Sequence, residues 1–433
     1  MSTAANPAPL RLGLAGLGTV GIGVVKIVQE HAALIEARTG RPVVITAVSA
    51  RDRTKNRDAD LSGYAWETDP VALARREDVD VFVEVMGGHE GPARDATEAA
   101  LATGKDVVTA NKALLAHHGQ ALALAAEAAG RVIRFEAAVA GGIPVIKALT
   151  EGLAGNRMKR VMGVMNGSCN YILTRMQAAN LSYEAVFEEA RQLGYLEADP
   201  NLDVGGIDAG HKLSLLASIA FGTKVSFGAV ELEGIGNVSI DDIRLAEDMG
   251  YRIKLLGVAQ MTGRGLEQRM TPCLVPASHP LGQLQGGTNM VVLEGDSVGQ
   301  IVLRGPGAGM GPTASAVMGD VIDLARGTRL PTFGQPAASL ADPGPAKSAT
   351  PAPYYLRMTL LDKPGALAKI ATCLGDSGVS IDQMRQYGHE GTNAPVLIVT
   401  HKAGRDDIDH AISRFAATGV LVGDPVVLRI EEV

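Results

Sequence analysis

The stretch that decides the fold is LRLGLAGLGTVGIGVVKIV, residues 10–28. Its first six residues predict a buried strand, and a long helix is predicted to run on to about residue 38. Between them lie three glycines in the spacing G-x-G-x-x-G, where a tight turn leaves the first amides of the helix free to bind a pyrophosphate. The motif alone is weak evidence, but its place between a strand and a helix favours a dinucleotide site. The residues predicted to contact the dinucleotide are Gly16, Gly18, Thr19, Val20 and Gly21.

Strands and helices continue to alternate after this motif, as expected for successive βαβ units. The Val/Ile-rich strands are of the kind found in a parallel sheet that is buried on both faces. A glycine-rich segment at 304–309 leads into a further helix that is expected to return to the same sheet. The sequence therefore predicts a Rossmann-type α/β domain over residues 1–150, with 305–330 returning to it. The predicted strands cover 42–50, 79–88, 104–110 and 130–142.

The loop after the second strand is cationic. An NAD site usually carries an acid there, to hold the ribose 2′-hydroxyl, but this chain has Arg51, Arg53 and Lys55. Such a cluster can accept the 2′-phosphate of NADP, although an ordinary charged surface loop explains it equally well. Arg51 and Lys55 therefore favour NADP, with NAD also possible.

Carboxylates gather in GYLEADPNLDVGGIDAGHKLSLL, residues 194–216. Asp208 and Lys212 are one helical turn apart, so both can face one pocket, although a solvated loop with an ordinary ion pair is the simpler reading. Asp199 is expected to cap a turn or helix. A second lysine, Lys112, follows a strand in VVTANKALL, at the sheet edge where α/β folds bind ligands.

The rest of the chain predicts two further domains. Residues 151–304 mix strands at 157–167, 251–260, 266–277, 288–295 and 299–305 with helices at 170–179, at 183–193 and from 207, as in an α+β domain. Residues 331–353 hold six prolines and have the composition of a linker. Residues 354–433 follow the order βαββαβ, which is the ferredoxin-like order.

Bulk properties exclude several classes of protein. A net charge of −7 over 433 residues argues against nucleic acid or an anionic membrane as the main partner. No secretory signal or membrane-spanning run is visible, and the three cysteines and nine histidines show no disulfide or metal spacing. These features predict a cytoplasmic protein.

Several motifs in one order identify the chain as similar to homoserine dehydrogenase with a C-terminal ACT domain, over essentially its whole length. These motifs are AGLGTVG, VVTANKALL, GGIP, NGSCNYIL, GYLEADPNLDVGGIDAGHK and GPGAGMGPTASAV. The resemblance implies reversible, NAD(P)H-dependent reduction of L-aspartate 4-semialdehyde to L-homoserine, in threonine and methionine biosynthesis. It also implies a homodimer or homotetramer.

The same resemblance implies roles for individual residues. Reduction of an aldehyde needs a proton at the oxygen and stabilisation of its charge, and lysine suits both needs. Lys212 and Lys112 are implied at the reacting oxygen, with Lys212 as proton donor, and Lys112 and Gly309 also at the cofactor. The substrate-binding carboxylates would be Glu197, Asp203 and Asp208. A sodium ion is implied at Glu136, Val139, Gly141 and Ile143, although a structural turn without an ion is almost equally good.

Three other functions were weighed against this one. Aspartate-semialdehyde dehydrogenase would need a thiolate, and its only candidate, Cys169, is better explained as a packing residue. A fusion with aspartokinase would need a kinase domain ahead of the first strand, which is predicted near residue 10. A non-catalytic amino-acid sensor would have no need of both lysines.

The tail resembles the ACT signature in LLDKPGALAKIA and GVSIDQM. The loop Asp362-Lys363-Pro364-Gly365 precedes a predicted helix whose first amides can accept the carboxylate of an amino acid. L-threonine is the first candidate effector by resemblance, and a dimerisation module without ligand is the alternative. The proline-rich linker is expected to let paired ACT domains move relative to the rest.

Overall fold

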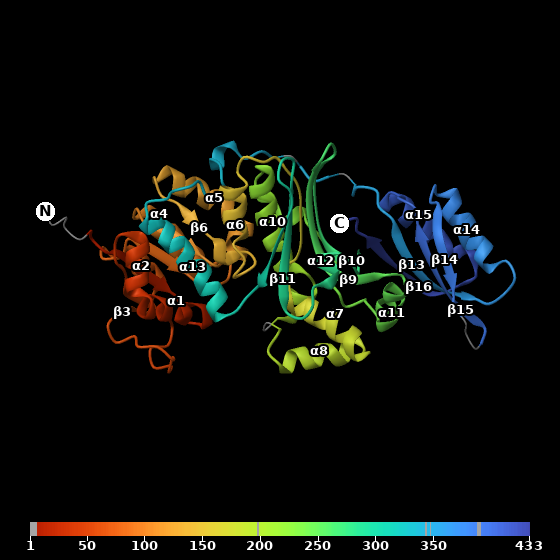
Figure 1. The fold of residues 1–433 in the computed structure, drawn as a ribbon, viewed down its shortest axis with the longest axis horizontal. Helices are drawn as coiled ribbons and strands as arrows, with labels where there is room; N and C mark the ends of the chain where they lie inside the picture. The colour runs from red at the N-terminus through yellow and green to blue at the C-terminus, as the bar shows by residue number, and fades with distance from the viewer. Residues whose placement is uncertain (1–6, 197–198, 343, 347, 388–390) are drawn as a thin grey trace.

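The computed structural model describes residues 7–196, 199–342, 344–346, 348–387 and 391–433. Three parts follow one another along the long axis of the molecule (Figure 1). The red and orange N-terminal part lies at one end, a part built around long strands lies in the middle, and the blue C-terminal part lies at the other end.

The first part is built on a six-stranded parallel sheet in the order β3-β2-β1-β4-β5-β6, which confirms the Rossmann-type prediction. Its strands are β1 (Leu10–Ala15), β2 (Val43–Ser49), β3 (Ala65–Glu67), β4 (Val81–Glu84), β5 (Asp106–Thr109) and β6 (Ile133–Arg134). Its helices are α1 (Thr19–Glu30), α2 (Ala32–Thr39), α3 (Pro70–Arg75), α4 (Pro92–Ala102) and α5 (Lys112–Ala128).

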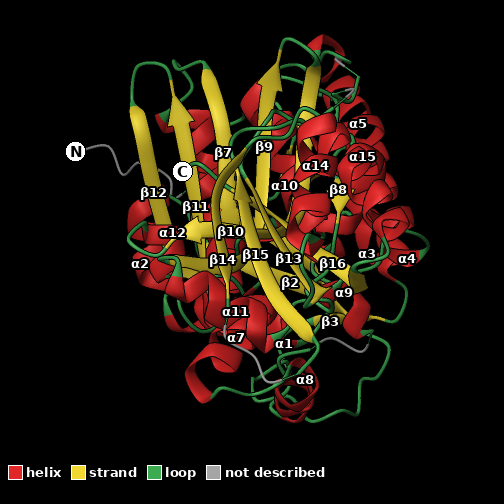
Figure 2. Ribbon diagram, turned by 90° about the vertical axis from the view of Figure 1, so that its right-hand side faces the viewer, coloured by secondary structure: helices red, strands yellow, loops and turns green. Residues whose placement is uncertain are grey.

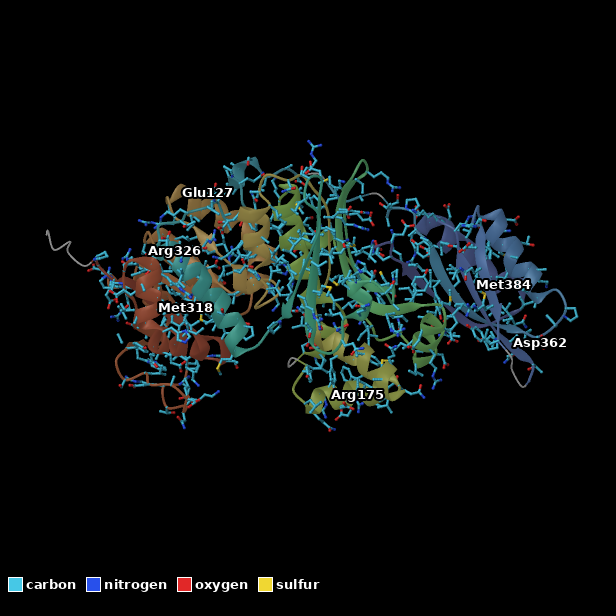
Figure 3. The ribbon with its side chains drawn as sticks, in the orientation of Figure 1. Glu127, Arg175, Met318, Arg326, Asp362 and Met384 are labelled. Carbon is cyan, nitrogen blue, oxygen red and sulfur yellow. The ribbon has the colours of Figure 1, made fainter. Side chains whose placement is uncertain are left out.

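Helix α13 (Met310–Ala325) returns to this part and lies beside α1 (Figure 1). The two helices pack closely because α1 carries a glycine at the crossing. A Cβ built on Gly23 would lie 2.8 Å from the Cβ of Ala314. Met318 of α13 is buried in the same apolar core as Leu12 and Val24, and it is labelled in Figure 3.

Two predictions for this part were wrong. The helix expected to reach residue 38 ends at Glu30, because His31 leaves helical geometry (φ −112°, ψ 16°) and α2 then starts afresh. The strand expected over 130–142 is only two residues long. The amide of Glu136 donates to Asp320 Oδ2 of α13 at 2.8 Å instead of to a strand, and a 3₁₀ turn, Glu136–Ala138, follows.

The middle and C-terminal parts share one ten-stranded sheet, ordered β12-β11-β7-β9-β10-β16-β13-β15-β14, with β8 paired to β10 (Figure 2). Its middle strands are β7 (Met158–Val164), β8 (Glu231–Leu232), β9 (Tyr251–Thr262), β10 (Gly265–Pro276), β11 (Thr288–Gly295) and β12 (Gly299–Pro306). The helices of the middle part are α6 (Val145–Lys147), α7 (Gly167–Ala179), α8 (Tyr183–Gln192), α9 (Pro200–Val204), α10 (Ile207–Phe221), α11 (Ile240–Asp248) and α12 (Pro280–Gln283), and a π-helical turn spans Ala148–Gly152.

The C-terminal part has the ferredoxin-like strand order β16-β13-β15-β14, as predicted. Its elements are β13 (Tyr354–Leu361), α14 (Ala366–Asp376), β14 (Ile381–Gln386), β15 (Asn393–Thr400), α15 (Arg405–Phe415) and β16 (Leu421–Ile430).

The expectation that the linker lets this part move stays a prediction, and the structure shows contacts that such a movement would have to break. Strand β16 pairs in parallel with β10, with Cys273 opposite Arg429 and Leu274 opposite Ile430. In the described part of this segment, Phe333 is buried against the first part of the molecule, with its ring centroid 5.6 Å from that of Phe135. Proline content predicted a chain without regular structure, but it does not reveal whether that chain is held by its neighbours.

In the described ranges, no helix combines the length and the apolar character that crossing a bilayer requires. The cytoplasmic location stays a prediction.

Candidate active site

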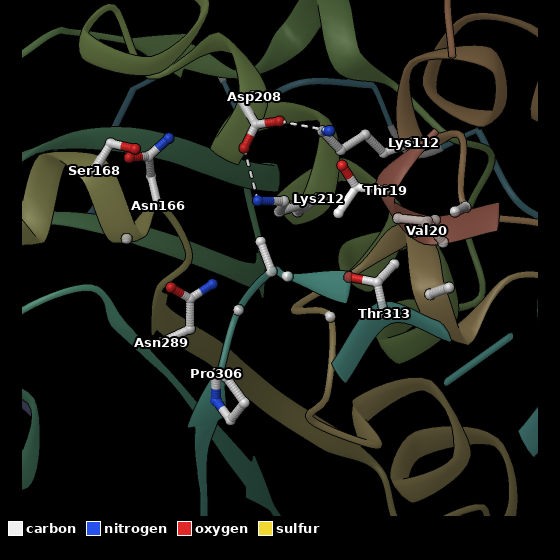
Figure 4. Close-up of a pocket in the computed structure, with 18 of the residues that line it drawn as sticks. Thr19, Val20, Lys112, Asn166, Ser168, Asp208, Lys212, Asn289, Pro306 and Thr313 are labelled. Atoms are coloured by element: carbon white, nitrogen blue, oxygen red, sulfur yellow. Dashed lines mark hydrogen bonds and ion pairs between the residues drawn. The ribbon is translucent and has the colours of Figure 1, made fainter. Parts of the chain in front are cut away.

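A cavity of about 650 Å³ opens between the first and middle parts of the molecule (Figure 4). The starts of α1 and α5 form one wall, together with the turn from β12 into α13. Helices α7, α9 and α10 and the start of β11 form the other. The cavity therefore lies at the carboxyl edge of the parallel sheet, where ligands of open α/β sheets bind.

Asp208 lies between the two predicted lysines, and dashed lines in Figure 4 mark both contacts. Its Oδ2 accepts a hydrogen bond from Lys212 Nζ at 2.6 Å, and its Oδ1 lies 2.7 Å from Lys112 Nζ. Burial acts to raise the pKa of Asp208, but the positive charges of Lys212 and Lys112 lower it below its usual range. The carboxylate is therefore ionised and binds both ammonium groups.

A backbone carbonyl and side-chain amides help to position the Asp208–lysine cluster. Lys212 Nζ also donates to the carbonyl of Met165 at 2.9 Å, and Asn289 Nδ2 donates to that same carbonyl at 3.1 Å. Asp203 lies on the cavity wall and accepts from Asn166 Nδ2 at 3.0 Å. The two carboxylates thus lie on the same wall of one cavity, as the loop–helix motif predicted.

Local sequence explains why the side chains face this space. Asn111 caps α5 by accepting the amide of Leu114 at 3.0 Å, so Lys112 begins the helix at the cavity. Gly206, in the left-handed region (φ 80°), precedes α10 and turns the chain before Asp208. Asp199 caps α9 by accepting the amide of Asn201 at 3.1 Å, which confirms its capping prediction.

The glycine motif leads into the start of α1, where Thr19 and Val20 line the cavity wall opposite Asp208. Gly16 has φ +103°, and a Cβ on Gly21 would lie 2.0 Å from the carbonyl oxygen of Gly16, so both positions require glycine. Gly18 caps α1 without a side-chain hydrogen bond, which leaves the first amides of that helix available to an anion. Of the predicted cofactor contacts, those on the cavity wall are Thr19, Val20, Lys112 and Gly309.

Arg51 and Lys55 are exposed on the loop after β2 and are not part of the cavity wall. A neighbouring residue that the sequence reading missed, Arg57, ties this loop to the glycine motif. Its Nε donates to the carbonyl of Leu17 at 3.2 Å, and its Nη2 donates to the carbonyl of Asp52 at 2.8 Å. The cationic loop is therefore held beside the glycine turn.

The four residues expected to bind sodium lie in the segment after β6. Glu136 is buried, and its two carboxylate oxygens accept the amides of Ile146 at 3.0 Å and Lys147 at 2.8 Å. Burial raises the pKa of Glu136 to about 7, and the charge of Asp320 adds to the rise, against those two hydrogen bonds. Gly141 lines the cavity, whereas Val139 and Ile143 are buried. Within the described ranges, no group of three or more His, Cys, Asp or Glu side chains could hold a metal ion.

Other predicted residues are placed less centrally. Glu197 lies outside the described residues. Cys169 is fully buried, and its Sγ donates to the carbonyl of Asp203 at 3.2 Å. Burial raises the pKa of this thiol well above its usual value, with further increases from Asp203 and Asp208, so a nucleophilic thiolate is disfavoured. The thiol packs behind the site, as expected.

Several polar residues on the cavity wall were not assigned from the sequence. Asn166 and Ser168 lie in the quoted motif NGSCNYIL, so their signal was present but was not read as a site. Asn289 is the second residue of strand β11, and a single polar residue in an apolar strand gives no signal that it will meet the carbonyl of Met165, far away in the sequence. The missed wall residues include Asn166, Ser168, Tyr195, Asn289 and Thr313.

A second, smaller cavity of about 200 Å³ lies in the C-terminal part. The loop Asp362, Lys363 and Gly365 forms one side of it, with the start of α14, and Gln386 of β14 forms another. It is far from the first cavity: Asp362 is labelled at the opposite end of the molecule in Figure 3.

Family models match three segments of the chain. Residues 16–136 match "Homoserine dehydrogenase, NAD binding domain", residues 144–322 match "Homoserine dehydrogenase", and residues 354–419 match "ACT domain". A homoserine dehydrogenase of Neisseria gonorrhoeae is 42% identical over 98% of this chain and 99% of its own length.

Solved structures agree with these matches. A homoserine dehydrogenase from Thiobacillus denitrificans has a TM-score of 0.93 at 39% identity and covers 99% of both chains. A hyperthermophilic archaeal homoserine dehydrogenase in complex with NADPH has a TM-score of 0.61 at 27% identity, covering 73% of this chain and 97% of its own. Sequence, fold and cavity together place this chain in the homoserine dehydrogenase family, whose members are NAD(P)-dependent oxidoreductases, here with a C-terminal ACT domain.

Proposed function

We propose that the cavity between the first two parts binds L-homoserine or L-aspartate 4-semialdehyde next to NADP(H) and interconverts the two substrates. The observation that carries this proposal is Asp208 held between Lys112 and Lys212 on the wall of a cavity that also includes the start of α1. This reaction would serve threonine and methionine biosynthesis.

Lys212 is the proposed proton donor to the carbonyl oxygen during reduction, and the acceptor of that proton in reverse. It reaches the cavity from a buried helix, with Asp208 and the Met165 carbonyl fixing its ammonium. Lys112 pairs with the other carboxylate oxygen of Asp208, and it would stabilise negative charge on the carbonyl oxygen of the substrate. Asp203, with Glu197, would bind the α-ammonium group of the substrate, because a carboxylate is the natural partner of that cation.

The residues around the glycine turn fit a dinucleotide. Gly16 and Gly21 allow the close turn, and the uncapped start of α1 offers amide donors to a pyrophosphate. When bound, the nicotinamide supplies or accepts the hydride at the substrate carbon. We propose NADP as the preferred cofactor, with Arg51 and Lys55 at the 2′-phosphate, because Arg57 holds their loop beside the glycine turn. NAD use is compatible with the same fold.

A sodium ion near Glu136 is also part of the proposal. Its ligands would be the Glu136 carboxylate and the carbonyls of Val139, Gly141 and Ile143, all oxygen atoms of the type that hard cations prefer. The two amide hydrogen bonds leave further lone pairs on the carboxylate. The ion would balance the buried charge of Glu136, and no catalytic step depends on it.

We propose the domain limits 1–150 with 305–330, 151–304, 331–353 and 354–433, in a homodimer or homotetramer. The edge strand β14 is almost wholly exposed and could pair ACT units of two chains. L-threonine is the proposed effector, in the cavity beside Asp362 and the start of α14. Replacing Gln386, which lines that cavity, by alanine should reduce inhibition by threonine without changing the uninhibited rate, whereas inhibition that is unaltered would place the effector elsewhere.

The decisive experiment follows absorbance at the NADPH band while the purified full chain is mixed with L-homoserine and NADP or NAD. We expect homoserine-dependent NADPH formation, reversed by L-aspartate 4-semialdehyde. No turnover with either cofactor, from protein that melts cooperatively, would contradict the proposed function. Equal kcat/KM with both cofactors would contradict only the preference for NADP.

A further inference from the structure

A third cavity, of about 1060 Å³, lies at the opposite edge of the Rossmann-type sheet from the active site. Its wall is formed where strands begin: Arg41 precedes β2, Arg11 lies in β1, Asp80 precedes β4, Lys105 precedes β5 and Arg131 precedes β6. Amino ends of parallel strands share one edge of a sheet, and the carboxyl ends form the active-site edge. This cavity is therefore separate from the active site.

Positive charge dominates the cavity wall. Three carboxylates contribute to it, and two of them are already paired. Asp80 accepts from Arg11 Nε at 3.1 Å and from Nη2 at 2.7 Å, and Asp106 accepts from Arg329 Nη1 at 2.5 Å. The exposed Glu77 is then the one carboxylate on the described wall that is left to balance the remaining cations. The six cationic side chains on the wall are Arg11, Arg41, Arg75, Lys105, Arg131 and Arg329.

Two of these arginines present buried donors without a partner. The Nε atoms of Arg41 and Arg131 are shielded from solvent and make no hydrogen bond within the described chain. Lys105 is 6% exposed, and its Nζ donates to the hydroxyl of Thr103 at 3.3 Å. Burial lowers the pKa of Lys105, with smaller effects in the same direction from Arg11 and Arg131, against the charge of Asp80. A buried donor without an acceptor is costly, and a shift of these side chains towards a bound anion would relieve that cost.

We infer that this cavity is a binding site for a small polyanion that carries two or more linked phosphate groups. Arginine forks match phosphate oxygens in pairs, and several uncompensated cations within one concave wall focus the field on a multiply charged ligand. The volume is ample for a nucleoside triphosphate. Free nucleotide and inorganic polyphosphate share this chemistry.

The test is calorimetric titration of the full chain, saturated with NADPH so that the cofactor site is filled, with ATP and separately with tripolyphosphate. We expect one molecule of ligand per chain and a Kd that rises with added potassium chloride. Tighter binding of ATP than of tripolyphosphate would identify a nucleotide as the ligand, and equal binding would identify the phosphate chain alone. No binding of either at millimolar concentration overturns the inference.

Variants locate the site. Arg41→Ala and Arg131→Ala should each raise the Kd at least tenfold, while Arg38→Ala, an exposed arginine of α2 that is not on the cavity wall, should leave it unchanged. Each variant is checked by its melting temperature and its rate of homoserine oxidation, because none of the three lies at the active site. Equal weakening in Arg38→Ala, or unchanged binding in both cavity variants, would overturn the assignment.

Discussion

Two buried ionic clusters lie on either side of the middle part of the molecule. On the wall of the active-site cavity, Asp208 binds Lys112 and Lys212. At the junction with the ACT part, Arg269 of β10 lies between two carboxylates, with Glu267 Oε1 at 3.0 Å and Glu431 Oε2 at 2.6 Å. Asp208 is 7% exposed and Arg269 is 2% exposed, so burial does not distinguish them.

The difference lies in free volume. Asp208 binds both lysines beside a space of about 650 Å³, so a ligand can approach the ammonium groups. At the junction, Arg429 also pairs with Glu431, at 3.2 Å, and the adjoining cavity measures only about 20 Å³, which is room for about one water. Buried charge therefore marks a candidate catalytic site only where it faces room for a ligand.

Replacing Lys212 by alanine should have the largest effect on the cavity cluster. Loss of the proposed proton donor should lower kcat by roughly 10²–10⁴-fold, as for other general acids, while the Kd of NADPH stays within about twofold. Steady-state kinetics and NADPH fluorescence measure the two effects. Lys224→Ala, at an exposed lysine just after α10, is the matched control and should behave as wild type. A near-normal kcat in Lys212→Ala would transfer proton donation to Lys112.

The junction cluster should respond in stability instead of rate. Arg269→Met leaves Glu267 and Glu431 buried without their main partner, which should lower the free energy of unfolding by about 3–5 kcal/mol. Urea unfolding measures the loss, and kcat at a temperature where the variant is folded should stay unchanged. Arg264→Met, at an exposed arginine at the end of the same hairpin, controls for loss of charge. A large fall in kcat with little loss of stability would give the junction a catalytic role.

Arg51→Ala tests the exposed margin of the cofactor site. The substitution removes the positive charge that we propose contacts the 2′-phosphate. It should raise KM for NADP about tenfold, equivalent to about 1.4 kcal/mol, and leave KM for NAD unchanged. NAD serves as the internal control, because it lacks that phosphate. Equal increases for both cofactors would mean that Arg51 acts on the loop instead of on the phosphate.

The smallest expected effect concerns acid stability at the junction. Burial acts to raise the pKa of Glu267, but hydrogen bonds from Gln260 and Thr350 and the charge of Arg269 lower it to about 2. The folded pKa lies below the unfolded one, so this stabilisation is complete above pH 4.5 and is lost as pH falls towards 2. Glu267→Gln should therefore lower the melting temperature at pH 7 and lower it progressively less from pH 5 to pH 3.5. A difference that does not change with pH would contradict this.

Local sequence determined much of this protein. The glycine spacing after residue 15 demands a strand, a tight turn and a helix, because Gly16 and Gly21 leave no space for a Cβ. The alternation of short Val-rich strands with helices predicted the parallel sheet, and Asp208 and Lys212 face one way because they are one helical turn apart. Each of these inferences depends on residues close in the chain.

Tertiary structure alone decided the rest, because the contacts join residues far apart in sequence. Lys112 contacts Asp208, which lies 96 positions later in the sequence, and Asn289 donates to the carbonyl of Met165. No local pattern predicts either contact. The composition of the proline-rich segment predicts a flexible linker. Only the structure shows that Phe333 packs against Phe135 and that β16 pairs with β10. Composition indicates which segments lack regular structure, but only packing decides whether they are fixed, because the stabilising burial comes from partners elsewhere in the chain.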